Sequence, residues 1–254
     1  MKTVLITGAA GNIGNKLRQH FQCHYDLRLL DIDSRGDKEI KQADLSVWSE
    51  SWSDHFQGVD TVIHMAADPT ANQIWDKVVG PNIDAVVNTL SASVKGGVKR
   101  VIFASSNHAM GGYKDIPEPN KITADTPPLP GTHWVANGKS HNSTAYGSAK
   151  LMGERMGKCF SDAYGISYIA VRIGWVQRDE NSLDDIPRDR DAWFRLMWLS
   201  NPDLCQLIGR CIDADPTIKF AVINGMSNNT GMRWDVEHAR ELVGYEPVDD
   251  ATRG

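Results

Sequence analysis

Short apolar runs alternate with helix-like segments over most of the chain. The runs are rich in β-branched residues, do not alternate with polar positions and have the length of strands, covering residues 4–7, 27–31, 61–65, 100–105 and 167–173. Between them, helical periodicity marks residues 14–21, 83–95 and 145–163. Strands that are apolar on both faces and alternate with helices predict an α/β protein with a doubly wound parallel sheet.

Two long segments interrupt this order. Residues 113–144 hold five of the eleven prolines, and because loops of this length are usually functional, we expect this one to line a site. Residues 175–193 carry nine charged side chains, which is typical of a solvated loop and also compatible with a lid. We therefore divide the chain into a main unit, residues 1–174, and a small C-terminal portion, residues 175–254, that is interleaved with it rather than an independent domain.

Composition and charge narrow the class of partner. The 254 residues carry a formal net charge of −5, with no basic cluster interleaved with aromatic residues, so neither nucleic acid nor a membrane surface is expected as a partner. The four cysteines are scattered, which predicts no metal site and no disulfide framework. The N-terminal apolar run is too short for a signal peptide. We expect a cytoplasmic protein that acts on a small molecule.

The stretch "TVLITGAAGNIGNKL" places three glycines between the first strand and the first helix. Gly8 permits a tight turn, Gly11 lets the backbone approach a pyrophosphate, and Gly14 allows the helix to pack closely on the strand. The start of the helix then offers unpaired N–H groups and a positive dipole end to phosphates. The pattern predicts a dinucleotide site.

An acidic residue at the end of the second strand indicates which dinucleotide. Asp31 follows Gly11 by twenty residues, where a carboxylate accepts hydrogen bonds from the ribose 2′-hydroxyl and repels the extra phosphate of NADP. Arg28 and Arg35 lie nearby and leave some use of NADP open. We expect NAD as the cofactor.

Candidate chemistry lies in "STAYGSAKLMG", where Tyr146 and Lys150 share one face of a predicted helix. A phenol normally ionises near pH ~10, but a neighbouring ammonium and a cationic nicotinamide favour its phenolate, so that it can act as a base. Upstream, Ser105 and Ser106 end an apolar strand, where doubly wound sheets bind ligands. His64 also ends a strand, but a buried histidine there is more often structural than catalytic.

Together these residues resemble the extended short-chain dehydrogenases/reductases, in the NAD-dependent epimerase/dehydratase group, which have a Rossmann fold. The shared elements span almost the whole chain: TGxxGxxG from Thr7 to Gly14, Asp31, Asp44-Leu45, "HMAA" from His64, Asn82, Ser106, Tyr146-x-x-x-Lys150 and the closing "ARELVGYEP".

The resemblance implies roles for particular residues. Ser106 would hold the reacting oxygen, Tyr146 would remove its proton, and Lys150 would lower the pKa of the phenol and bind the nicotinamide ribose. The implied cofactor-binding residues, which include contacts of Asp44 and Leu45 with the adenine, are Gly8, Gly11, Asn12, Ile13, Gly14, Asp31, Asp44, Leu45, Ala66, Ala67, Asn82, Tyr146 and Lys150. Relatives commonly dimerise through the two helices that begin near residues 83 and 145, so a homodimer is implied.

Within the group, "FASSNH" followed by "VRIG" is most similar to uronate dehydrogenases and related aldose dehydrogenases. Ser106, Asn107 and His108 would then bind the sugar, with no metal ion. Dehydratases of this fold carry an Asp-Glu pair where Asn107-His108 stands, so dehydration is not expected. Pro69 and Trp175 replace serines of the uronate enzymes, which indicates a changed pocket with Trp175 at the substrate.

A uronate also needs a cation for its carboxylate. Arg195 is the candidate, with Arg188 and Arg190 as rivals.

Three functions remain open from the sequence. The first is NAD-dependent oxidation of a free sugar or sugar acid at its anomeric carbon to the lactone, with Tyr146 as base. The second is epimerisation of a sugar nucleotide with NAD that never leaves the protein. The third is a sensor or scaffold that keeps the nucleotide fold without chemistry, against which the presence of Ser106, Tyr146 and Lys150 argues.

Overall fold

The computed structural model describes residues 1–186 and 191–253. Within these ranges a seven-stranded parallel sheet runs in the order β3-β2-β1-β4-β5-β8-β9. Its strands are β1 (Thr3–Thr7), β2 (Asp26–Asp31), β3 (Ile40–Gln42), β4 (Thr61–His64), β5 (Arg100–Ser106), β8 (Ser167–Ile173) and β9 (Phe220–Gly225). The predicted doubly wound Rossmann fold is confirmed, because the order of the strands reverses at β1 and the chain winds outward on both sides.

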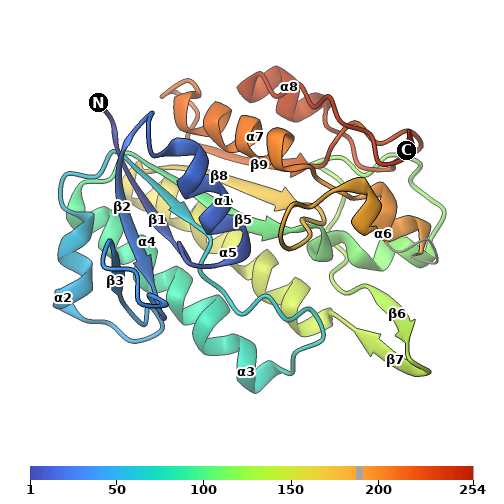
Figure 1. The fold of residues 1–254 in the computed structure, drawn as a ribbon, viewed down its shortest axis with the longest axis horizontal. Helices are drawn as coiled ribbons and strands as arrows, with labels where there is room; N and C mark the ends of the chain where they lie inside the picture. The colour runs from blue at the N-terminus through green and yellow to red at the C-terminus, as the bar shows by residue number, and fades with distance from the viewer. Residues whose placement is uncertain (187–190, 254) are drawn as a thin grey trace.

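Helices cover both faces of the sheet (Figure 1). One layer contains α1 (Asn12–Phe21), α7 (Asn201–Asp213) and α8 (Glu237–Val243). The other contains α2 (Glu50–Ser53), α4 (Ala85–Gly96) and α5 (Thr144–Tyr164), with α3 (Trp75–Val79) beyond it and a π-helical turn, Gly80–Asp84, that leads into α4. The short α6 (Ala192–Leu196) lies over the carboxyl end of the sheet, and 3₁₀ turns span Asp54–Phe56, Asn107–Asp115 and Leu183–Asp185.

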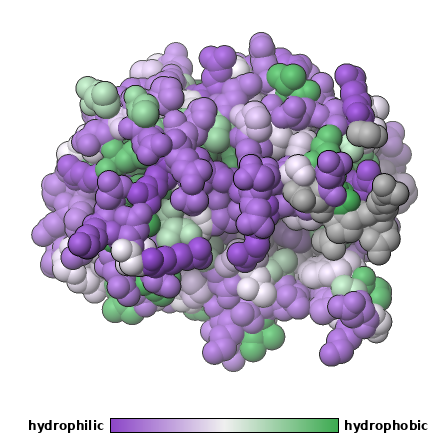
Figure 2. Space-filling model, in the orientation of Figure 1, coloured by the Kyte–Doolittle hydropathy of each residue, from purple (hydrophilic) through white to green (hydrophobic). Residues whose placement is uncertain are grey.

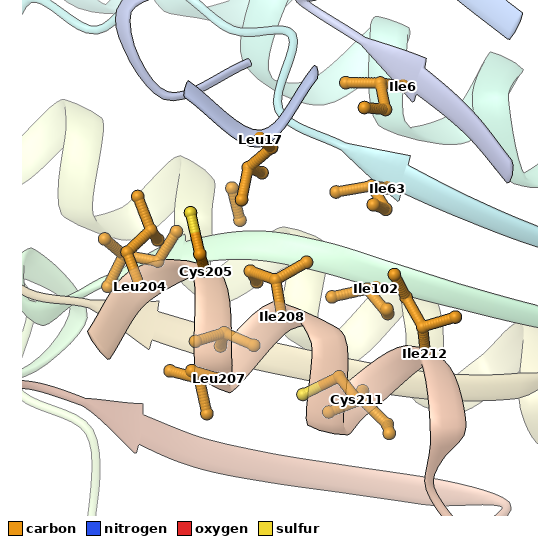
Figure 3. Close-up of a cluster of buried hydrophobic side chains, with 14 of the residues drawn as sticks. Ile6, Leu17, Ile63, Ile102, Leu204, Cys205, Leu207, Ile208, Cys211 and Ile212 are labelled. Atoms are coloured by element: carbon orange, nitrogen blue, oxygen red, sulfur yellow. The ribbon is translucent and has the colours of Figure 1, made fainter. Parts of the chain in front are cut away.

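The largest apolar core lies between the sheet and the layer of α1 and α7 (Figure 3). Ser200 caps α7 by accepting a hydrogen bond from the Asp203 N–H at 3.1 Å, and the next residues place Leu204 and Ile208 on one buried face. This face meets Leu17 of α1. The C-terminal portion thus supplies both a helix that covers the sheet and the last strand of the sheet, β9.

Four strands were not expected from the sequence. β3 is three residues long with one buried side chain, and β9 follows the charged segment in the C-terminal portion. β6 (His133–Ala136) and β7 (Lys139–Asn142) form an antiparallel hairpin inside the proline-rich segment. Its turn, Asn137-Gly138, has positive φ at both residues, which is the geometry that an Asn-Gly pair between strands favours.

The surface is mostly polar. Figure 2 shows hydrophilic residues over most of one face, with apolar residues scattered among them. No helix of the described chain is both long enough and apolar enough to span a membrane. The described residues likewise contain no cluster of His, Cys, Asp and Glu that could hold a metal ion.

Candidate active site

A cavity of about 1000 Å³ opens at the carboxyl ends of β1, β2, β4, β5 and β8. This is the edge at which doubly wound sheets bind ligands. Of the residues predicted for the site, those that line it are Gly8, Gly11, Asn12, Ile13, Gly14, Asp31, Asp44, Leu45, Ala66, Ala67, Ser106, Asn107, His108, Tyr146, Lys150 and Trp175. Asn82 and Arg195 do not line it.

The glycine-rich turn is shaped by two contacts that admit no side chain. Gly8 has φ +69°, and a Cβ there would lie 2.7 Å from the backbone nitrogen of Ala66. A Cβ on Gly14 would lie 2.0 Å from the carbonyl oxygen of Gly8, to which the Gly11 N–H donates at 3.0 Å. The backbone of the turn therefore reaches the cavity directly at the start of α1, as a pyrophosphate requires.

The end of β2 fixes Asp31 beside this turn. Its carboxylate accepts the backbone N–H of Ala10 at 2.9 Å and that of Asp33 at 3.1 Å, which leaves lone pairs for a ribose hydroxyl. Arg28 points elsewhere, because its guanidinium donates to two carbonyls near α2, those of His55 and Gln57. Arg35 does line the cavity. Of the two arginines considered for NADP, the structure brings one to the site.

The loop after β4 forms one wall of the cavity. Ala66 and Ala67 line it directly, whereas Asn82 is buried behind it. The Asn82 side chain accepts from the Asp68 N–H at 2.8 Å and donates to the Asp68 carbonyl at 3.1 Å. Both of its polar atoms thus hold the loop, so Asn82 supports the wall rather than forming it.

Asn12 joins the glycine-rich turn to the segment after β8. Its amide donates to the carbonyls of Val176 at 3.2 Å and Gln177 at 3.0 Å, and Lys16 bridges from Asn12 to the Asp179 carbonyl. Val176 and Gln177 themselves line the cavity. These contacts place the start of the predicted C-terminal portion over the cofactor end, which the sequence did not indicate.

Ser106, Tyr146 and Lys150 meet at the other end of the cavity. Ser106 ends β5 and accepts the backbone N–H of His108 at 3.2 Å, while α5 presents Tyr146 and Lys150 one turn apart. The Lys150 ammonium lies 5.7 Å from the centre of the Tyr146 ring and 5.2 Å from that of Phe103. The structure therefore brings the predicted trio together.

Burial shifts the pKa values of Tyr146 and Lys150. It raises the pKa of Tyr146 from 10.0 to about 12; a hydrogen bond with Ser106 opposes the shift, and the nearby Asp68 carboxylate adds to it. Burial lowers the pKa of Lys150 from 10.5 to about 8. Lys150 is thus charged at neutral pH, while Tyr146 needs further positive charge nearby to become a base.

His108 is held as a neutral hydrogen-bond donor. Burial lowers its pKa from 6.5 to about 4. Its Nδ1 lies 2.7 Å from the Ser143 hydroxyl and 2.9 Å from the Thr132 hydroxyl, and either hydroxyl can donate to it. With Nδ1 as acceptor, the proton of the neutral ring is on Nε2, where it can donate to a substrate oxygen.

Asn107 offers an acceptor beside this donor. Its amide nitrogen donates to the Ile173 carbonyl at 3.3 Å, while Oδ1 is buried without a partner in the described chain. Because an unpaired buried carbonyl is costly, a ligand hydroxyl is its natural partner. Asn107 and His108 therefore supply one acceptor and one donor, a pair that suits sugar hydroxyls.

Aromatic and apolar side chains complete the wall. Trp175 lines the cavity as predicted, and its backbone pairs with Met197 and Leu199. Trp134 from the β6–β7 hairpin, with Phe194 and Met197 from the region of α6, also lines it. The sequence did not predict Trp134, Phe194 and Met197 at the site, because they lie in segments for which no helix or strand was expected.

The predicted carboxylate-binding arginine does not reach the cavity. Arg195 belongs to α6, whose Phe194 lines the cavity, but its own side chain is not part of the lining. The rival residues 188 and 190 lie outside the described residues.

His64 lies beneath the cavity rather than in it, and its buried Nε2 has no hydrogen-bond partner among the described residues. It is buried below the site, its Nδ1 lies 2.8 Å from the Thr7 hydroxyl, and burial lowers its pKa to about 3. It joins the ends of β1 and β4 beneath the cavity and does not line it.

The residues present fit NAD. The crowded glycines expose backbone at the start of α1, and Asp31 keeps free lone pairs at the end of β2. Ala43, Leu45 and Lys150 also line the cavity, where the first two would form an apolar wall for the adenine and Lys150 would bind the nicotinamide ribose.

Known proteins are similar to this chain over most of its length. Residues 4–176 match the model of the NAD dependent epimerase/dehydratase family. The chain is 33% identical to an NAD-dependent glucose-6-phosphate dehydrogenase of Haloferax volcanii, over 98% of this chain and 94% of that protein. It is 32% identical to a uronate dehydrogenase of Pseudomonas putida, over 98% and 84%. The solved uronate dehydrogenase of Agrobacterium tumefaciens superposes with a TM-score of 0.81 at 26% identity, over 99% and 86%. The chain belongs to the NAD-dependent epimerase/dehydratase family, as its motifs predicted.

Proposed function

We propose that the protein is an NAD-dependent dehydrogenase that oxidises the anomeric carbon of a free sugar or sugar acid to the lactone. The observation that carries the proposal is one continuous cavity, with a dinucleotide turn at one end and Ser106, Tyr146 and Lys150 at the other. Asn107 and His108 beside the trio provide the acceptor and donor that a polyhydroxylated substrate needs.

The roles of the side chains follow from their positions. The Ser106 hydroxyl holds the anomeric oxygen, and the Tyr146 phenolate takes the proton from it. The Lys150 ammonium favours that phenolate, and the Nε2–H of His108 donates to another substrate oxygen. NAD, when bound, supplies a hydride acceptor and a positive charge.

The relatives support oxidation over epimerisation. The glucose-6-phosphate and uronate enzymes are both dehydrogenases, and each is similar over nearly the whole of this chain. The solved UDP-galactose 4-epimerase is only 19% identical, with a TM-score of 0.67, which shows a shared fold alone.

A tyrosine variant tests the proposal. Tyr146→Phe removes the base, so NADH formation with free aldoses and uronic acids is expected to fall by about 10²- to 10⁴-fold. Tyr164→Phe is the matched control, because Tyr164 is exposed at the far end of the same helix. Undiminished turnover in Tyr146→Phe would exclude Tyr146 as the base. If the protein retains bound NAD and interconverts sugar nucleotides without forming free NADH, the epimerase alternative is favoured.

We also propose a homodimer formed through α4 and α5. Val87 on α4 and Met152 on α5 are exposed apolar side chains on the two helices expected to form the interface. A monomer in analytical ultracentrifugation at micromolar concentration would contradict this. A cytoplasmic location is supported by the four cysteines, all of them free thiols.

A further inference from the structure

Asp68 is a carboxylate of the cavity that the proposed mechanism leaves without a role. It follows β4 by four residues and lines the cavity together with Ser106 and Tyr146. β4 and β5 are neighbours, with His64 opposite Phe103, so the loop that carries Asp68 lies beside the turn that carries Ser106. The carboxylate is close enough to Tyr146 to contribute to the raised pKa of its phenol.

The fold holds Asp68 in place. Its backbone N–H and carbonyl are both bonded to the buried amide of Asn82. One carboxylate oxygen accepts the Thr70 N–H at 2.9 Å, and the other accepts the Gln73 amide at 3.1 Å. A carboxylate has about four lone-pair positions, so acceptor capacity remains on both oxygens.

The hydrogen bonds of Asp68 favour its ionised form. Partial burial raises its pKa, but the hydrogen bonds from Thr70 and Gln73 outweigh this and keep the pKa below its ordinary value. Among the described residues, no ion pair includes Asp68. An ionised carboxylate without a cation is satisfied by a strong donor such as a hydroxyl.

Chemistry identifies which hydroxyl. In a cyclic sugar, the carbon that bears the reacting hydroxyl has two neighbours in the ring, the ring oxygen and C2. The ring oxygen has no proton to donate, and an ionised carboxylate can only accept. Beside the reacting end of the sugar, the partner that a carboxylate can take is therefore the hydroxyl on C2.

Resting on the proposed function, we propose that Asp68 is a specificity-determining residue that accepts a hydrogen bond from the C2 hydroxyl of the sugar. The protein then selects 2-hydroxy sugars over 2-deoxy sugars, whether or not C6 carries an acid. Asn82 acts as a positioning residue for this contact, through the backbone of Asp68.

The test is a thermodynamic cycle in which the C2 hydroxyl of the sugar and the carboxylate of Asp68 are removed separately and together. Wild type and Asp68→Asn are compared on D-glucose with 2-deoxy-D-glucose and on D-galactose with 2-deoxy-D-galactose, by kcat/KM. Wild type is expected to discriminate against each 2-deoxy sugar by about 10- to 100-fold, the loss typical for a hydrogen bond to a charged group. In Asp68→Asn this discrimination is expected to fall by about tenfold or more. The discrimination against the 6-deoxy forms of the same sugars is expected to be equal in wild type and Asp68→Asn.

Asp33→Asn is the matched control. It removes the same charge from the same cavity, but at the end of β2 near Asp31. Its discrimination against 2-deoxy sugars should equal that of wild type. Thermal melting of each variant checks that it is folded.

The same cycle can be measured without turnover. For this, tryptophan fluorescence reports the binding of each sugar to the protein–NADH complex. If removing the hydroxyl and removing the carboxylate are coupled in binding affinity but no NADH forms, the Asp68 contact is supported and the proposed oxidation is refuted for these sugars. Equal discrimination by wild type and Asp68→Asn overturns the Asp68 contact alone. Weaker NADH binding in Asp68→Asn with unchanged discrimination also overturns it, by assigning Asp68 to the cofactor. If neither pair of sugars is bound or oxidised, the Asp68 contact is overturned for them and D-glucose and D-galactose are excluded as substrates.

Discussion

The two ends of the cavity are built in different ways. At the dinucleotide end, the surface is largely backbone: the turn around Gly8, Gly11 and Gly14 meets the loop after β4 so closely that a Cβ on Gly8 would lie 2.7 Å from Ala66. At the sugar end, the surface is made of side chains, such as His108 and Trp134, that come from separate segments.

This difference explains what each end can change. A backbone surface depends on conformation that few residues can adopt, so substitutions there alter the shape of the turn itself. A surface of side chains from several loops can be altered one residue at a time. The cofactor end is therefore the constant part of the site, and the sugar end is where members of one fold can diverge in substrate.

After that of Tyr146→Phe, the largest expected effect comes from adding one methyl group to the backbone end. In Gly14→Ala the new Cβ would lie 2.0 Å from the Gly8 carbonyl oxygen, so the turn must shift. A displacement of this size costs about 10²-fold, and we expect NADH affinity to weaken by that factor.

Gly209→Ala on α7 is the control for Gly14→Ala, because its Cβ would meet only an ordinary contact with Phe21 at 3.5 Å. Fluorescence titration with NADH measures both variants. Equal affinity of Gly14→Ala and wild type would show that the turn does not hold the dinucleotide.

An intermediate effect is expected from pH, which acts on the sugar end. Because the pKa of Tyr146 is raised, its phenol is largely protonated at neutral pH, and kcat/KM should rise about tenfold per pH unit as the phenolate forms. The slope should flatten above about pH 8, where Lys150 loses its charge.

His108 has a pKa of about 4 and stays neutral throughout, so no separate step is expected near pH ~6.5. Rates measured from about pH 6 to about pH 9, with NADH affinity measured in parallel, test this. A fall in kcat/KM over that range would contradict Tyr146 as the base.

The smallest effect is expected at Arg195, which does not line the cavity. Arg195→Ala should change KM for glucuronate by less than about twofold, as for an ordinary surface cation. The comparison with D-glucose isolates any contact with the carboxylate. A tenfold rise in KM for glucuronate, with no change in KM for D-glucose, would show that Arg195 contacts the carboxylate of the substrate.

Most of the sheet was predictable because buried parallel strands leave continuous apolar runs. The missed strands β3, β6 and β7 lack that signal, because β3 buries one residue of three and neither β6 nor β7 contains a fully buried residue. β9 does contain such an apolar run, Phe220 to Ile223, which was not interpreted as a strand. The Asn137-Gly138 pair was a usable hairpin signal in a segment interpreted as loop. α7 was readable from Ser200 and its amphipathic face, but it follows a charged segment that hid the boundary.

The cofactor end was predictable because its glycines form one continuous motif and Asp31 follows that motif at a characteristic spacing. Asp31 and the glycines follow from spacing alone, whereas Asn82 acts through hydrogen bonds that only the folded chain reveals. At the sugar end, Trp134 comes from the β6–β7 hairpin and Phe194 from α6, and local sequence patterns do not show how these short elements are placed over the sheet. Asp68 directly follows "HMAA" in the sequence, but only the tertiary structure shows that it lies close to Tyr146.

The amide of Asn12 has a consequence for how the protein is made. The glycine-rich turn leaves the ribosome well before the carbonyls that Asn12 holds, which belong to residues 176 and 177. Synthesis at about 5–20 residues per second separates the two by many seconds. The nascent chain therefore completes its cofactor pocket only after residues 176 and 177 have emerged, however early the glycine-rich turn has formed.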